Sequence, residues 1–357
     1  MEVKLSRIST LGILLGLVYA LAGIISAYFE PPYHIALLGL GVGLLFPSSI
    51  YITFTGSLKS GLPRRGMEAV TPLLAVLAAS LAPPYSLISL NGGLTLGALA
   101  VILLGAHVYF QVVGWRRRES RLLLFYPVFS GVVGLTVSII RGYGVIERLA
   151  ISGASIAVSM VYTVSLTTIA RNYGFDPSRR IAHIPFVILL LGLAIYAYDP
   201  GYSLSIISVS MVLYYLVLGI HRAAFVLGRA RRGPPVLAAT FRYMVTAHIL
   251  SLLASIGALY SSLTGNILIA IHYIFIGFIG LHILLHAPLM LPQITGVILR
   301  KNYNPSPLIL LALASIIRGV QGEASLALVV ASLVVAFVQF RPVGLIGGVK
   351  KRLRGAK

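Results

Sequence analysis

The chain of 357 residues contains no cysteine. Disulfide bonds, thiolate-held iron–sulfur clusters and the Cys-x-x-Cys-His attachment of covalent haem are therefore excluded. Acidic residues are also scarce, with eight Asp and Glu in total, and all of them fall in loops or at the ends of apolar runs. This scarcity excludes Ser-His-Asp catalysis and carboxylate-bridged metal pairs inside those runs. Histidine is therefore the ionisable side chain, apart from tyrosine, that is placed within them.

Charge of either sign is rare, because only 10% of the residues are charged while 58% are hydrophobic, and the mean hydropathy is +0.96. A soluble domain carries about 25% charged residues. The apolar residues are grouped in blocks of about 16 to 25, which is the length that crosses a bilayer as a helix. The composition predicts an all-α, polytopic transmembrane helical bundle.

Twelve apolar ranges are predicted to form helices: 11–29, 34–56, 67–83, 90–113, 122–140, 148–170, 181–198, 203–221, 241–262, 266–288, 306–318 and 323–340. The breaks between them contain turn-forming pairs such as Pro31-Pro32 and Pro83-Pro84. The longest predicted loop, 222–240, is too short for a soluble domain. We therefore expect residues 1–357 to form a single integral membrane domain with a basic tail at 341–357. The first run is longer than the core of a signal peptide, so we expect it to remain as the first span.

The net charge of +20 is distributed unevenly along the chain. If the N-terminus is cytoplasmic, all but three of the 28 Lys and Arg residues fall on the cytoplasmic side, and the exceptions are Arg141, Arg148 and Arg318. This agrees with the positive-inside rule in every loop. It predicts a protein of the cell (plasma) membrane with both termini cytoplasmic. The basic face is expected to contact anionic lipids rather than nucleic acid.

Eight histidines remain to be explained. His34 stands at the outer start of the second range and His272 lies early in the tenth, so the two are at compatible depths. The other six fall in the inner half, where His282 and His286 are one helical turn apart. A neutral histidine in lipid is well suited to metal ligation. An inner site is expected to draw on four of them, namely His107, His248, His282 and His286.

Less specific interpretations remain open for the same residues. His34 could lie at the lipid interface, and His272 could be a packed histidine with a backbone hydrogen bond. Interfacial placement is favoured for His183, His221 and His286. The tyrosine-rich ends are most simply explained as aromatic belts; they contain Tyr196, Tyr198, Tyr202, Tyr214 and Tyr215.

Two segments carry a family resemblance. "PPYHIALLGLGVGLLF" (31–46) and "IHYIFIGFIGLHILL" (271–285) resemble helices 2 and 10 of the haem–copper oxidase catalytic subunit, and more closely those of the NnrS family, which is similar to that superfamily. The resemblance implies that His34 and His272 ligate a non-covalent b-type haem. It implies electron transfer or a response to a gas such as NO or O2, with a redox partner or quinol. Glycines that follow each histidine (Gly39, Gly41; Gly277, Gly280) are expected to leave room beside the macrocycle.

The copper site of the oxidases has no counterpart. It needs a histidine on helix 6 and a His-His pair on helix 7, but 148–170 contains none and 181–198 contains only His183. We therefore expect no terminal oxidase activity, and whether the protein is an enzyme at all stays open. The alternative is a permease or structural membrane subunit without a cofactor. The colour of the purified protein separates these two hypotheses.

Overall fold

The structure is a computed structural model, and it describes residues 5–29, 34, 37–58, 67–113, 122–143, 145–176, 179–295, 297–300 and 302–345. This part of the chain is helical apart from one two-stranded antiparallel sheet. Seven helices within it are long and apolar enough to cross a membrane, and they contain Arg7–Ser26, Asn91–Gln111, Ala150–Thr168, Pro200–Leu218, Pro235–Leu263, Ile267–Met290 and Gly322–Gln339. The prediction of a helical bundle is confirmed.

The contacts group the chain into two compact units. The first contains Met1–Ile169 and Asp176–Ser210, and the second contains Ala170–Phe175 and Met211–Lys357. The boundary falls within one helix, α9 (Pro200–Leu218). Whether the chain behaves as one integral domain stays a prediction.

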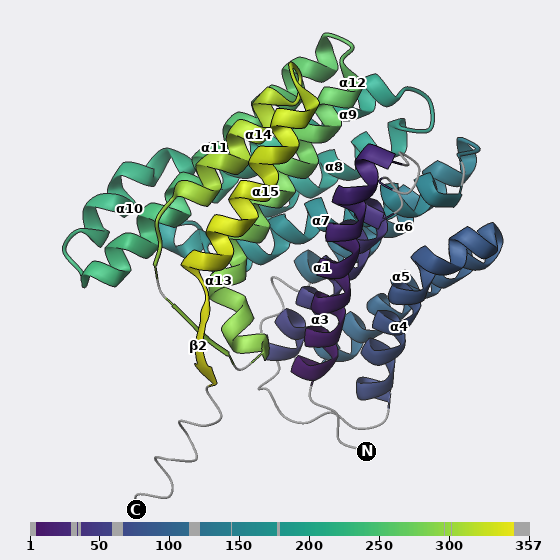
Figure 1. The fold of residues 1–357 in the computed structure, drawn as a ribbon, viewed down its shortest axis with the longest axis horizontal. Coiled ribbons are helices and arrows are strands. Elements are labelled where there is room, and N and C mark those ends of the chain that lie inside the picture. Colours follow the sequence, from purple (N-terminus) through teal and green to yellow (C-terminus); the bar gives the residue numbers. More distant parts are fainter. Residues whose placement is uncertain are drawn as a thin grey trace, which may run out of the picture. The chain divides into compact units, whose positions relative to one another are not determined.

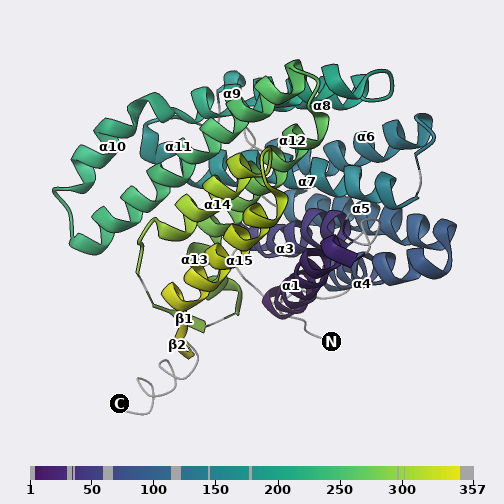
Figure 2. The ribbon, with the colours of Figure 1, turned by 45° about the horizontal axis from the view of Figure 1, so that its top comes forward.

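The first unit consists of helices that pack as sequential pairs, and Figure 2 shows α4 beside α5 and α6 beside α7. Close approach of α6 and α7 depends on small residues, because a Cβ at Gly134 would lie 2.7 Å from Ser155 Oγ. The elements are α1 (Leu5–Phe29), the π-helix η1 (Leu38–Leu45), α3 (Phe46–Leu58), α4 (Met67–Ile88), α5 (Leu90–Val113), η3 (Leu122–Leu124), α6 (Tyr126–Ile140), α7 (Val145–Thr168), η5 (Arg180–His183) and α8 (Ile184–Ile195).

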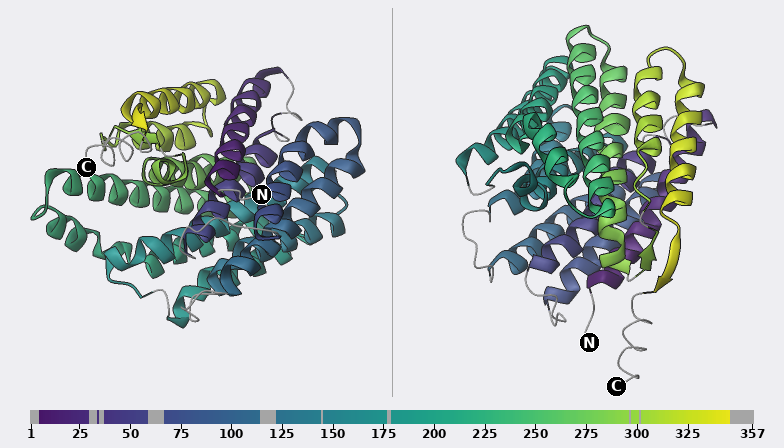
Figure 3. Two further views of the ribbon diagram at one scale, coloured as in Figure 1. Left: turned by 90° about the horizontal axis from the view of Figure 1, so that it is seen from below. Right: turned by 90° about the vertical axis from the view of Figure 1, so that its left-hand side faces the viewer.

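The second unit is built around α11, α14 and α15, which run side by side (Figure 1; Figure 3, right). A continuous helical run, α12–η7–α13, packs against α11 and contains a π-helix in its middle. The elements are η4 (Ala170–Tyr173), η6 (Ile220–Arg222), α10 (Ala223–Ala230), α11 (Pro235–Leu263), α12 (Ile267–His272), the π-helix η7 (Tyr273–Gly280), α13 (Leu281–Thr295), β1 (Val297–Leu299), α14 (Ser306–Ile317), α15 (Gly322–Gln339) and β2 (Pro342–Leu345).

Apolar side chains lie on the outside of both units. Ile88 is 83% exposed and Ile140 is 69% exposed in the first unit, while Leu263 is 68% and Phe337 is 71% exposed in the second. Many serines and histidines are buried instead. Water would penalise such a surface, whereas hydrocarbon accepts it, and a helix pairs the backbone groups of its interior within itself. The surface therefore agrees with the composition of a multi-pass membrane protein.

Each of the twelve predicted ranges overlaps a helix of the structure. The main difference is α10, a short helix inside the range 222–240 that was predicted to be a loop. One side of α10 is buried through Val226 and Ala230, while Phe225 and Arg229 are exposed. Its eight residues are too few to span a bilayer.

Candidate functional site

His34 is half-buried in the first unit, four residues before the π-helix η1 begins. Its Nδ1 lies 2.8 Å from the carbonyl oxygen of Gly23 on α1. A Cβ on Gly23 would lie 2.9 Å from Leu38 Cγ, so the absence of a side chain allows this close approach. Because a carbonyl only accepts, Nδ1 carries the proton, and Nε2 carries the lone pair of the neutral ring.

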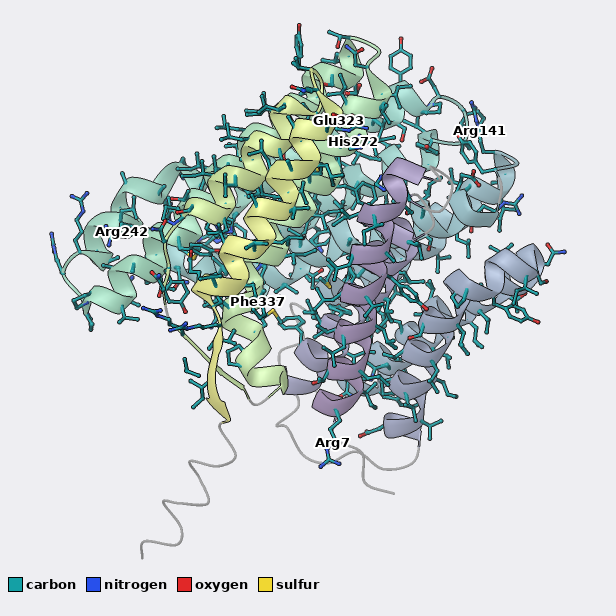
Figure 4. The ribbon with its side chains drawn as sticks, in the orientation of Figure 1. Arg7, Arg141, Arg242, His272, Glu323 and Phe337 are labelled. Carbon is teal, nitrogen blue, oxygen red and sulfur yellow. The ribbon has the colours of Figure 1, made fainter. Side chains whose placement is uncertain are left out.

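His272 has the same arrangement in the second unit. It ends α12 directly before the π-helix η7, and its Nδ1 lies 2.7 Å from the carbonyl oxygen of Leu268. Figure 4 shows His272 toward the end of α15 where Glu323 lies, away from the end where Phe337 lies. Ile269 on α12 would contact a Cβ on Gly319 at 3.3 Å, which also places α12 beside the start of α15. His34 and His272 belong to different units of the chain.

The glycines after these histidines do not leave room beside a flat macrocycle, contrary to our expectation. A Cβ on Gly41 would lie 2.4 Å from Tyr19, and one on Gly277 would lie 2.5 Å from Ala254. A Cβ on Gly280 would lie 3.1 Å from Leu311. These glycines let helices pack closely, which is their usual role in membrane proteins. The packing around Gly39 lies outside the part of the structure whose side-chain contacts are described.

The second unit contains a cluster of buried histidines, which we call the inner cluster: His248 on α11 with His282 and His286 on α13. The ring centroids of His248 and His282 are 5.7 Å apart, and those of His282 and His286 are 6.2 Å apart. His248 is 0% exposed and His282 is 2% exposed. The placement of His282 and His286 on one face agrees with their one-turn spacing.

The packing of α11 against η7 places this cluster. Gly257 faces the ring of Tyr273, Ala254 faces Gly277, and the Ser251 hydroxyl donates to the Gly277 carbonyl at 3.2 Å. These small residues are spaced three apart on α11, so successive ones are neighbours in an oblique row, and they let the two helices approach. His248 stands three residues before Ser251 in the same row, and its ring lies 5.7 Å from the ring of His282 just beyond the end of η7.

Two tyrosines are hydrogen-bond partners of the inner cluster. The Tyr173 hydroxyl lies 2.9 Å from His248 Nδ1, and the Tyr215 hydroxyl lies 3.5 Å from His282 Nε2. His282 Nδ1 is held by the Phe278 carbonyl oxygen at 2.9 Å. His248 Nε2 is buried and has no hydrogen-bond partner within the part of the chain that the structure describes.

The prediction of aromatic belts is wrong for Tyr214 and Tyr215, which are fully buried against Phe278 and His282. It agrees with Tyr198 and Tyr202, which are exposed. Tyr173 could not be identified from the sequence, because a residue in the turn after α7 meets α11 only in the folded chain.

The remaining histidines lie elsewhere. His107 is buried in the first unit with Nε2 3.3 Å from the Ile52 carbonyl oxygen, so it belongs to a different unit from the inner cluster. His183 lies 3.2 Å from the Tyr126 hydroxyl at the start of α8, and His221 is exposed. His286, for which interfacial placement was also favoured, is buried in the inner cluster.

Across the described ranges, no three His, Asp or Glu side chains are grouped so that they could hold a metal ion. Comparison of the chain with protein-family models, curated proteins and solved structures found no match. The histidines themselves are therefore the guide to function. His34 and His272 are each bonded to a backbone carbonyl through Nδ1, and the inner cluster combines buried histidines with tyrosines.

Proposed function

We propose that the chain is a protein of the cell membrane with twelve spans and both termini cytoplasmic. Support comes from contacts that join loops predicted to share a side. Arg141 donates to the carbonyl oxygens of Ala197 and Tyr198, joining two loops expected outside. Arg222 donates to the carbonyl oxygens of Tyr173 and Gly174, joining two expected inside.

The two-stranded sheet supports the same topology. It pairs Val297–Leu299 with Pro342–Leu345, two segments predicted to be cytoplasmic. Each of these contacts lies within one unit. Two predicted spans separate the partners of each contact, so the topology places both partners on the same face. An odd number of spans would have placed them on opposite faces. The assignment of the basic side to the cytoplasm depends on the positive-inside rule.

As the activity, we propose haem-based electron transfer or a response to NO or O2, with His34 and His272 as the ligands of a non-covalent b-type haem. The observation that carries this proposal is the shared local arrangement of the two residues. Each bonds a backbone carbonyl through Nδ1, and each stands shortly before an eight-residue π-helix. Metal-ligating histidines typically donate their second N–H in this way, and π-helices are frequent at functional sites.

The groups around the two proposed ligands have definite roles. The carbonyl oxygens of Gly23 and Leu268 fix the tautomer and the ring orientation of His34 and His272. Held by these two imidazoles, a haem would supply one-electron chemistry. Space for the macrocycle must come from elsewhere than Gly41, Gly277 and Gly280, which contact other side chains.

Absorption spectroscopy of the purified protein tests the haem proposal. The wild type, expressed with haem available, should show a Soret band and low-spin bands in the reduced-minus-oxidised spectrum. His34→Ala and His272→Ala should both lose the low-spin bands, because each removes one axial ligand. His221→Ala is the matched control, since His221 is exposed, and it should keep the full spectrum.

Two results would contradict the proposed ligands. One is a wild type that stays colourless after reconstitution with haem. The other is an unchanged spectrum in both the His34 and the His272 variant. Circular dichroism of each variant separates loss of a ligand from loss of the fold.

A further inference from the structure

A short hairpin of the second unit is rich in arginine. It consists of α10, the turn after it and the start of α11, and Figures 1 and 2 show α10 beside the first part of α11. We call residues 223–242 the arginine hairpin. Four of its side chains are exposed guanidinium groups, namely Arg229, Arg231, Arg232 and Arg242.

The second unit offers these arginines no carboxylate. Its sequence contains a single acid, Glu323, and no Asp or Glu stands anywhere between Asp199 and Glu323. Glu323 lies in the first turn of α15, which is beside α12 and therefore near the far end of α11. The 29 residues of α11 extend about 43 Å, so Glu323 is too distant to pair with the hairpin. The positive charge of the hairpin is uncompensated within its own unit.

The length of α11 places the hairpin at the level of the lipid headgroups. The hydrocarbon core is about 30 Å thick, so a spanning helix of about 43 Å extends beyond it by roughly 13 Å. Arg242 is the one Lys, Arg, Asp or Glu residue in α11. It lies about 32 Å from Leu263, the last residue of the helix, at about 1.5 Å per residue. The first charge of α11 therefore falls where the helix leaves the hydrocarbon.

Exposed apolar side chains accompany the arginines. Phe225 is 66% exposed, and Val236 and Leu237 at the start of α11 are also exposed. Phe225 and Arg229 are one helical turn apart on α10, so they share a face. A nucleic acid or a soluble anion would leave these apolar groups in water. A phospholipid offers phosphate oxygens to the guanidinium groups and acyl chains to the apolar side chains.

We propose that the arginine hairpin binds the headgroup of an anionic phospholipid, with the phosphate among the arginines and the acyl chains against Phe225. Clusters of four to eight basic residues next to a span typically recognise anionic lipids. The proposal is more specific than attraction of lipid to a basic face, because charge and apolar side chains belong to one element. It requires that α11 cross the membrane, for which its length and composition suffice, and it does not depend on haem.

Native mass spectrometry of the full-length protein in detergent tests the site by counting bound lipids. The probes are dioleoyl phosphatidylglycerol and dioleoyl phosphatidylcholine, which share a phosphate and acyl chains but differ in net charge. Wild type should bind phosphatidylglycerol more tightly. Arg231→Gln/Arg232→Gln should lower that affinity about 25-fold, since each arginine at an anionic surface contributes about five-fold, and should leave phosphatidylcholine binding unchanged. Phe225→Ala should weaken both lipids alike, because it removes an apolar contact.

Arg300→Gln/Arg341→Gln is the matched control, because both residues are exposed, lie in the same unit beside the two-stranded sheet and remove the same charge. It should bind phosphatidylglycerol like wild type. Circular dichroism of each variant establishes that it is folded. An equal loss in the hairpin and control variants would overturn the site, as would equal affinity of wild type for the two lipids.

Competition separates a lipid from other anions. Inorganic phosphate or a polyglutamate peptide, at the concentration of the lipid, should leave phosphatidylglycerol bound, because neither contacts the apolar side chains. Displacement by phosphate would replace the lipid site with a general anion site, and displacement by the peptide would favour an acidic protein partner; either result overturns the proposal. None of these measurements involves haem, so the two proposals fail separately.

Discussion

Gly277 offers a sharp test of how α11 and η7 pack. A Cβ at this position would lie 2.5 Å from the Ala254 Cβ and 3.1 Å from the Ser315 Oγ, so Gly277→Ala must push η7 away from α11 and α14. Overpacking of this kind costs about 1–3 kcal/mol. The hydrogen bond from Ser251 to the Gly277 carbonyl, at 3.2 Å, would also weaken, which adds roughly 0.6 kcal/mol for a bond in a membrane protein.

The sum, about 1.6–3.6 kcal/mol, should lower the unfolding midpoint by roughly 2–5 °C. An unfolding entropy of about 2.1 cal/mol/K per residue corresponds to about 1.3 °C per kcal/mol for a chain of 357 residues. Thermal unfolding of the purified protein in detergent, followed by circular dichroism, measures the shift. The matched control is Gly228→Ala on α10, where nothing lies within 4 Å of the new Cβ and alanine favours the helix. It should not lower the midpoint.

A compensating change makes the reasoning refutable. Ala254→Gly removes the methyl group that Gly277→Ala would meet, so the double variant should recover much of the lost stability. Contacting residues typically show coupling energies of about 0.5–3 kcal/mol. A Gly277→Ala protein as stable as wild type, or a double variant no more stable than Gly277→Ala, would refute the packing argument.

Two further predictions concern topology and activity. Because the chain has no cysteine, single variants Tyr202→Cys and Gly355→Cys can be labelled in intact cells without background, and only Tyr202→Cys should react with an impermeant reagent. Labelling of both from outside would refute the topology. The isolated protein should consume no more dioxygen with a reduced quinol or artificial donor than a free-haem control, because residues 148–170 and 181–198 lack the three copper histidines. Consumption above that control would refute the prediction that the protein is not a terminal oxidase.

The helices could be predicted from the sequence because lipid demands long apolar runs. The range predicted as 90–113 agrees with α5 at both ends, and 306–318 agrees with α14 to within one residue. The π-helices could not be predicted in this way. Their hydrogen-bond register depends on contacts with neighbouring helices, such as those of Gly277 with α11 and α14, and apolar composition is the same in either register.

The candidate residues were predictable only in part. His282 and His286 share a face because their spacing is local, and local spacing can be seen in a sequence. The neighbours of His248 depend on tertiary structure, since Tyr173 is distant in the chain and Tyr215 could equally have faced lipid. The same ambiguity led to the wrong placement of Tyr214 and Tyr215.

The second unit includes Ala170–Phe175, a segment that the chain supplies between α7 and α8 of the first unit. Its assembly is therefore tied to the order of synthesis. Tyr173 leaves the ribosome well before α11, so its contact with His248 can form only after that helix has been synthesised. A fragment beginning at Met211 would contain both His248 and His282 but would lack Tyr173. The C-terminal half of the chain therefore cannot keep the contacts of its histidine cluster when it is separated from the N-terminal half, because Tyr173 lies in the N-terminal half.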